Sequence, residues 1–146
     1  MMVAMMKKQK GVALVEFALV SPLLLIMTFI VTEYSRALYQ YNTLTKSVRD
    51  AARYLSVQSP GAGITQSKNL IVYGNPAGSG SPLAIGLSTS QVPDPVWAFS
   101  GTLPVINTVT VKITGYTFRP LFGSVFGLNF GNITYADISA TMRAPL

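Results

Sequence analysis

The chain contains no cysteine and no histidine, and only 5 of its 146 residues are acidic. Without cysteine, an exported domain has no disulfides, so its stability must come from packing or from neighbouring subunits. Without either residue the usual ligands of zinc and copper are missing, and we expect no metal site and no cofactor. The acids beyond residue 33 are only Asp50, Asp94 and Asp137, and no nucleophile has an evident base beside it. We therefore expect a protein that is not an enzyme.

Basic residues outnumber acidic ones, and the formal net charge is +6. Three of the positive charges, Lys7, Lys8 and Lys10, lie together ahead of an apolar stretch. Basic residues beside a membrane segment are the signal that keeps that end of a chain in the cytoplasm. We interpret these lysines as a leader and topology signal, and we expect no nucleic-acid partner.

The apolar stretch covers residues 12–32 and holds a single charged side chain, Glu16. As a helix it would rise about 30 Å, which is enough to cross a bilayer once. A secretory signal peptide has a shorter apolar core of about 7 to 15 residues, with its cleavage site after the core. Here the small residue Gly11 lies before the core instead. The sequence predicts a single membrane-spanning helix in contact with lipid, with the N-terminus cytoplasmic and the C-terminal domain on the other side.

Glu16 is the most informative residue of this stretch. A carboxylate inside a membrane helix costs about 2.5 to 3.5 kcal/mol, so it is a functional candidate that needs a partner. Cleavage between Gly11 and Val12 would create an α-amino group with a pKa of about 7.7 to 8, mostly positive at neutral pH. Glu16 of one subunit could then pair with the amino terminus of a neighbour. The alternative is an uncleaved anchor helix in which Glu16 faces a different membrane protein.

Pro22 lies inside the same stretch and removes the amide that would bond to the carbonyl of Ala18. Ser21 or a neighbouring helix can satisfy that carbonyl in a membrane. The sequence therefore predicts a kink at Pro22, which is either simply tolerated or used as a hinge.

Helical periodicity continues after the membrane stretch. Apolar and small residues recur at alternating spacings of four and three. They are Tyr34, Leu38, Tyr41, Thr45, Val48, Ala52 and Leu55. No proline or glycine interrupts residues 31–58, so we expect residues 33–58 to form an amphipathic continuation of the same helix. We expect the stripe to pack on the chain's own domain, with other subunits as the alternative.

Residues 59–146 are predicted to form an exported α+β domain. A short helix over residues 64–73 ends at Gly74, although residues 70–73 alone also suit a strand. A loop rich in Gly, Pro and Ser follows over residues 74–90. Strands are predicted near residues 96–99, over 105–118 and over 132–143, where apolar and polar residues alternate.

The connection between the last two strands, residues 119–130, is apolar and contains three phenylalanines. Soluble monomers seldom expose large apolar patches. We therefore expect this segment to be buried over the sheet, with contact to another subunit as the alternative.

Residues 11–54 resemble the TadE-like domain of pilin-like proteins from bacterial tight-adherence systems. The matching features are a glycine, then VEFAL, then an apolar run containing a proline, and an Ala-Ala-Arg near the end of the helix. The resemblance implies a pilin-like α+β fold, with a long N-terminal helix packed on a mainly antiparallel sheet of three or more strands.

The resemblance also implies roles for several residues. Gly11 and Val12 would form the cleavage site of a prepilin peptidase, with residues 1–11 as the leader. Glu16 and Phe17 match the Glu-aromatic pair of tight-adherence pilins and, with Pro22, would serve subunit assembly. The implied partners are that peptidase, other pilins or pseudopilins, and the pilus assembly platform. The implied function is that of a minor pilin or pseudopilin of the bacterial inner membrane; an uncleaved accessory or scaffold protein of the cell envelope is the alternative.

Overall fold

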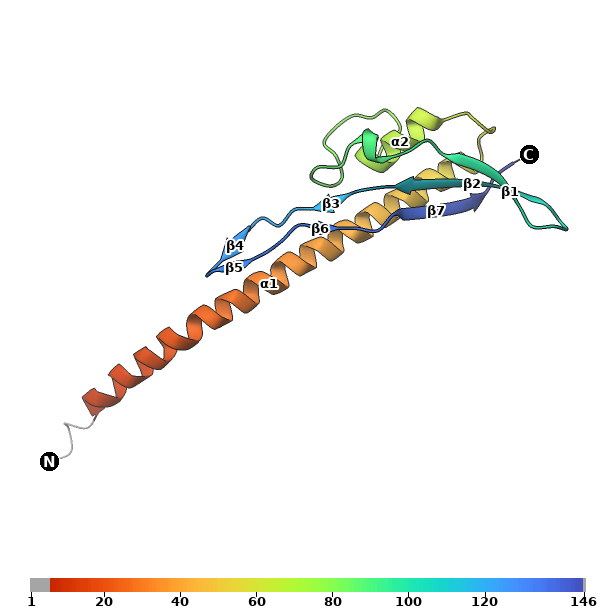
Figure 1. The fold of residues 1–146 in the computed structure, drawn as a ribbon. Coiled ribbons are helices and arrows are strands. Elements are labelled where there is room, and N and C mark those ends of the chain that lie inside the picture. Colours follow the sequence, from red (N-terminus) through yellow and green to blue (C-terminus); the bar gives the residue numbers. More distant parts are fainter. Residues whose placement is uncertain (1–5, 146) are drawn as a thin grey trace. The chain divides into compact units, whose positions relative to one another are not determined.

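The computed structural model describes residues 6–145, and these residues form α-helices, a short 3₁₀ helix and antiparallel strands (Figure 1). This confirms the predicted α+β class and the long N-terminal helix. The chain divides into two compact units. The first comprises the described chain up to Arg36 together with Pro120–Phe130, and the second comprises Ala37–Arg119 and the described chain from Gly131 onwards.

Helix α1 covers Met6–Leu55, so the predicted membrane stretch and its continuation form one helix. It ends at Leu55, three residues before the predicted end at 58. The helix continues through Pro22 without interruption. Further along, the hydroxyl of Thr28 donates to the Leu24 carbonyl and that of Thr32 to the Thr28 carbonyl, each at 2.8 Å. These polar side chains are thereby satisfied within the helix itself.

The second unit is built on a three-stranded antiparallel sheet with the order β1–β2–β7. The strands cover Val96–Ser100 (β1), Ile106–Ile113 (β2) and Ile138–Arg143 (β7). On β2 the side chains of Val109, Val111 and Ile113 are buried, whereas those between them are half-buried. The predicted alternation is therefore confirmed on the central strand.

The two long predicted strands are each interrupted. Strand β2 ends at Ile113, and only Thr117–Phe118 (β3) resumes it before residue 119. Strand β3 pairs with Ile133–Thr134 (β6) in a separate two-stranded ladder. Gly115, with φ of 66°, lies in the gap between β2 and β3. The chain leaves the extended conformation there, because a left-handed residue cannot continue a strand.

Helix α2 covers Ile64–Tyr73, as predicted, and it ends at Gly74, whose amide donates to the Leu70 carbonyl. Gly74 has φ of 75°, the left-handed conformation that commonly closes a helix. The following loop contains a short 3₁₀ helix, η1, at Thr89–Gln91. Buried residues of α1, α2, the loop and the strands form one hydrophobic core. Its fully buried members include Leu44, Val48, Leu55, Ile71, Val72, Val109, Val111, Ile113, Tyr116 and Phe118.

The buried face of α1 differs in part from the predicted stripe. Val48, Ala52 and Leu55 are fully buried, which confirms its C-terminal half. Tyr34, Leu38 and Tyr41 are instead exposed, at 63%, 50% and 43%. The buried positions in this part of the helix are Glu33, Ala37 and Leu44. In this part of α1 the large residues of the predicted stripe therefore lie on the exposed face. The buried face carries Glu33, Ala37 and Leu44 instead.

In the first unit, residues 120–130 form a β-hairpin. Its strands are Ser124–Val125 (β4) and Leu128–Asn129 (β5), and the Phe130 amide closes the base by donating to the Gly123 carbonyl at 3.0 Å. Leu121, Phe122, Phe126 and Leu128 are 42–65% exposed. The expectation that this segment is buried over the sheet is therefore wrong. Its two-residue strands offer too little surface to cover these side chains.

Candidate functional site

The surface of α1 around Gly11 and Glu16 is an exposed apolar helix face interrupted by one carboxylate. Val12, Phe17 and Leu19 are exposed at 69%, 67% and 74%. A shallow groove runs along this face and is lined by Gly11, Val12, Val15, Glu16 and Leu19. Residues four apart on a helix lie on the same side, so Val12 and Glu16 border the same groove. The helix thus presents the predicted cleavage site and the predicted assembly residue together.

Glu16 makes no hydrogen bond or ion pair with any side chain that the structure describes, which are those of residues 11–145. It lies on the helix beside apolar side chains, which offer no donor. A carboxylate in such a setting is costly in lipid unless a cation or a donor meets it. The partner of Glu16 is therefore not supplied by the described part of its own chain.

Gly11 has no packing role in the fold. A Cβ added there would meet no atom within 4 Å. Inside a helix, glycine is less favourable than alanine by roughly 0.5 to 1 kcal/mol. Helix α1 therefore gains nothing from this glycine, and its presence calls for an explanation outside the described structure.

The other predicted residues differ in how far they are described. Phe17 lies on the exposed apolar surface, and Pro22 is half-buried within α1. Lys7, Lys8 and Lys10 belong to the first turns of α1, but their side chains lie outside the described part of the structure. The segment before residue 6, which the sequence assigns to the leader, also lies outside it.

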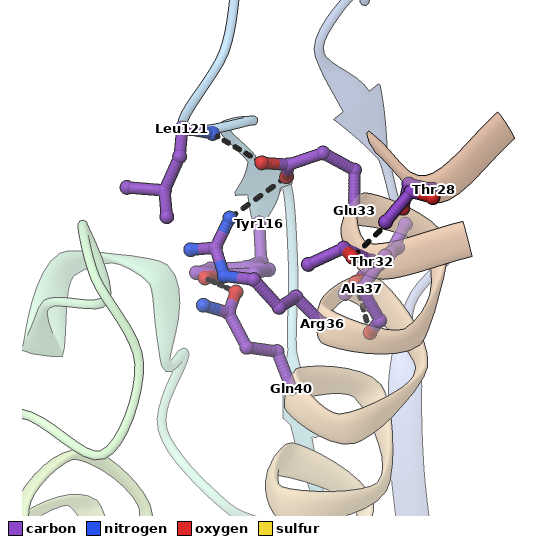
Figure 2. A network of polar contacts seen from close by, with 9 residues as sticks. Thr28, Thr32, Glu33, Arg36, Ala37, Gln40, Tyr116 and Leu121 are labelled. Carbon is purple, nitrogen blue, oxygen red and sulfur yellow. Dashed lines mark hydrogen bonds and ion pairs between the residues drawn. The ribbon is translucent and has the colours of Figure 1, made fainter. Parts of the chain in front are cut away.

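A second carboxylate, Glu33, is part of a site that the sequence analysis did not find. Glu33 is only 5% exposed. Figure 2 shows its two oxygens engaged separately: Oε1 accepts a hydrogen bond from the Leu121 amide at 3.1 Å, and Oε2 lies 2.7 Å from Nη1 of Arg36. The spacing of three between Glu33 and Arg36 is the one sequence signal that indicates this pair. Leu121 connects the pair to the β4–β5 hairpin.

Within the second unit, two tyrosines form hydrogen bonds with the part of α1 that belongs to this unit, from Ala37 onwards. The Tyr116 hydroxyl donates to Oε1 of Gln40 at 2.8 Å, as drawn in Figure 2, and lies 3.0 Å from the Ile85 carbonyl oxygen. The Tyr135 hydroxyl donates to the Ala37 carbonyl at 2.6 Å. Burial raises the pKa of Tyr116 above its ordinary value of 10.0. Burial, and secondarily the charge of Tyr116, raise the pKa of Tyr135.

The remaining acids do not converge on a site. Asp94 pairs with Lys68 at 2.6 Å, and Asp137 lies 3.6 Å from Lys112. These are surface pairs, which contribute little to stability. Within residues 6–145, no three acidic side chains come close enough together to hold a metal ion.

The described structure has one helix, α1, that is long and apolar enough to cross a membrane. Such an N-terminal helix is compatible with a single-pass anchor, and with the antiparallel sheet it has the organisation expected of a pilin-like protein. Residues 11–53 match the family model described as TadE-like protein. The chain thus carries a TadE-like segment that starts at Gly11 and includes Glu16, Phe17 and Pro22, which confirms the resemblance seen in the sequence. Comparison with curated proteins and with solved structures gives no match.

Proposed function

We propose that this protein is a minor pilin or pseudopilin of a tight-adherence pilus system, a structural subunit rather than an enzyme. Before assembly, α1 anchors it in the bacterial inner membrane, with the N-terminus cytoplasmic and the second unit outside the cytoplasm. A prepilin peptidase then cuts between Gly11 and Val12. The TadE-like match over residues 11–53 supports involvement in such a system.

The observation that carries the proposal is Glu16, which lies on an exposed apolar helix face and has no partner among the described side chains of residues 11–145. A permanent single-pass anchor has no need of a carboxylate there, because the charge only opposes insertion. A subunit that joins a helical bundle can use it, since the free amine of a neighbouring Val12 would neutralise it. Charge pairing of this kind fixes which subunit enters and in which register.

Gly11 supports the same proposal from a different direction. Its Cβ position is open and its helix would be more stable with alanine. A protease that binds an extended backbone in a narrow site does benefit from a residue without a side chain. Gly11 is then a substrate residue that is recognised during processing and removed with the leader.

In the proposed mechanism, an assembly platform extracts the cleaved subunit from the membrane. The apolar face of α1 exchanges lipid for the helices of neighbouring pilins, and Glu16 pairs with the incoming Val12 amine. The second unit, with its own hydrophobic core, remains on the surface or at the tip of the filament. Its folded sheet is not needed for the helix contacts, so it is available for adhesion.

The test is intact-mass spectrometry of the native protein from cells with and without the cognate prepilin peptidase. A mass that begins at Val12 only when the peptidase is present supports the proposal. Retention of the leader in both strains contradicts it and favours an uncleaved accessory or scaffold protein. Gly11→Val is the matched variant: the structure accommodates the new side chain, so helix content should not change while cleavage falls.

A further inference from the structure

We propose that the free edge of strand β1 pairs with the same strand of a second copy, so that two chains join their sheets through β1. The occupant of this edge is the chain itself, in antiparallel register about Ala98. The inference concerns the second unit alone, so it goes beyond the pilin role proposed above and does not rest on it.

Strand β1 is open along one side. It pairs with β2, and no other strand of the described chain lies beside it. Exposed edges are usually protected by a charge, a proline or a bulge. The sequence of β1, VWAFS, includes no charge and no proline, and its register with β2 is continuous. The opposite edge of the sheet, β7, carries Arg143. Two copies can therefore meet at β1 without like charges facing each other.

The backbone groups on this edge belong to Trp97 and Phe99. The Ala144 amide donates to the Asn107 carbonyl, so Asn107 bonds toward the side of β7. Phe99 lies opposite Asn107. Hydrogen-bonded and non-hydrogen-bonded pairs alternate along an antiparallel ladder. The N–H and C=O of Phe99, and those of Trp97 two residues earlier, therefore point away from β2 to the open side.

These groups select one register for a second β1. With a two-fold axis at Ala98, Trp97 of each copy faces Phe99 of the other, and every outward N–H and C=O of both strands is paired. The neighbouring registers fail. An axis at Trp97 would place Phe99 against Pro95, which has no N–H. An axis at Phe99 would place Trp97 against Gly101, whose φ of 87° lies outside the strand conformation.

The side chains fit the same register. Trp97 and Phe99 lie on the core-facing side of the sheet, because their partners on β2 are buried. Phe99 is nevertheless 74% exposed. A pocket of about 400 Å³ opens beside Trp97 and is lined also by Pro60 and Asn107. A cavity of about 150 Å³ can hold benzene, so this pocket admits a phenyl ring. In the register about Ala98, the exposed ring of each copy fills the pocket of the other, which is the self-complementarity that a two-fold interface requires.

The test is disulfide trapping in the full chain, which has no cysteine of its own. Ala98→Cys places a thiol from each copy at the axis, where the Cα atoms of a non-hydrogen-bonded pair lie about 4.5 Å apart, within the range of a disulfide. Ser100→Cys is the matched control, because it is an exposed position on the same face of β1. Its two Cα atoms would lie about 14 Å apart along the strands.

We expect Ala98→Cys to give roughly tenfold more cross-linked dimer than Ser100→Cys under the same mild oxidation in detergent micelles. A mixture of Val96→Cys and Ser100→Cys chains, one of them tagged, should also cross-link, because these positions face each other in the register. Adding Phe99→Glu, a change at an exposed position, should reduce the Ala98→Cys dimer roughly fivefold while the circular dichroism stays the same.

Equal cross-linking of Ala98→Cys and Ser100→Cys overturns the inference, since random collision gives the same result. Trapping that Phe99→Glu leaves unchanged overturns it as well. Oxidation in native membranes adds a third outcome: an Ala98→Cys product whose mass is not that of two copies shows that another protein occupies the edge, and also overturns the inference. None of these outcomes depends on leader cleavage, so the proposed pilin role is tested separately.

Discussion

The backbone amide of Leu121 donates a 3.1 Å hydrogen bond to Oε1 of Glu33, across 88 positions of sequence. The other oxygen of this buried carboxylate is occupied by Arg36 at 2.7 Å. Both oxygens therefore have partners, which is the condition for burying a carboxylate without a large penalty. The bond also connects the hairpin to the helix turn that follows the membrane stretch.

Glu33→Ala should loosen the hairpin. Loss of the acceptor leaves the Leu121 amide without its protein partner, at a cost of about 1 kcal/mol, or roughly a fivefold faster exchange of that amide. Hydrogen exchange of the full chain in detergent micelles measures this directly. Glu33→Gln is the matched control, because it retains an oxygen acceptor and should change the exchange rate less. An unchanged rate in Glu33→Ala would show that the bond does not hold the hairpin.

The second unit should lose stability at high pH. Its fold favours the neutral forms of Tyr116 and Tyr135, whose pKa values are both raised. The resulting stability is fully present below pH 10 and is lost as the pH rises through the raised pKa values. Urea unfolding of the full chain between pH 8 and 11 should show this decline. The slope should be smaller in Tyr116→Phe, whereas Tyr39→Phe, at an exposed position of α1, should behave like the unsubstituted chain.

Glu16→Gln should block filament incorporation and spare membrane insertion. The substitution removes the charge with almost no change in shape, and an uncharged side chain inserts more readily into lipid. Incorporation is measured by the amount of the protein in sheared pili, and insertion by membrane fractionation. Leader cleavage, read by intact mass, should continue. Normal entry of the variant into filaments would refute the charge-pairing mechanism.

The contact of α1 with the second unit should depend on its last turns. Leu55 is fully buried, and Leu55→Ala should lower the free energy of unfolding by about 2 to 5 kcal/mol. Val57, two residues later, is 76% exposed, so Val57→Ala should change it by less than about 0.5 kcal/mol. Chemical denaturation of the full chain in micelles compares the two. Equal effects would contradict the observed packing of α1.

The regular parts of the fold could be predicted from the sequence because their signals are local and periodic. Continuous helical periodicity predicted α1, Gly74 predicted the end of α2, and the alternation of Val109, Val111 and Ile113 predicted β2. The gap at Gly115 was missed because a glycine within an alternating pattern does not reveal its φ. The exposure of residues 120–130 was missed because apolar composition favours burial and does not reveal that the segment folds into a short hairpin.

The two carboxylates show that local signals could be predicted at the candidate sites as well, whereas long-range contacts could not. Glu16 is conspicuous because it is the single charge in an apolar run. Glu33 follows directly after that run, where a charged residue looks like an ordinary boundary. Its burial depends on Leu121, which lies far away in sequence, so only the folded chain reveals it. Whether Glu16 pairs with a neighbouring Val12 remains a prediction.

Glu16 and Glu33 also mark the two ends of the uncharged part of α1. The residues between them, 17–32, carry no charge and rise about 24 Å as a helix. A bilayer has a hydrocarbon core of about 30 Å, so the uncharged part of α1 is shorter than the lipid it would cross. Such a hydrophobic mismatch is relieved by thinning the membrane or by clustering short helices. Subunits of this kind would gather where the bilayer is already thinned by their neighbours, before any filament contact forms.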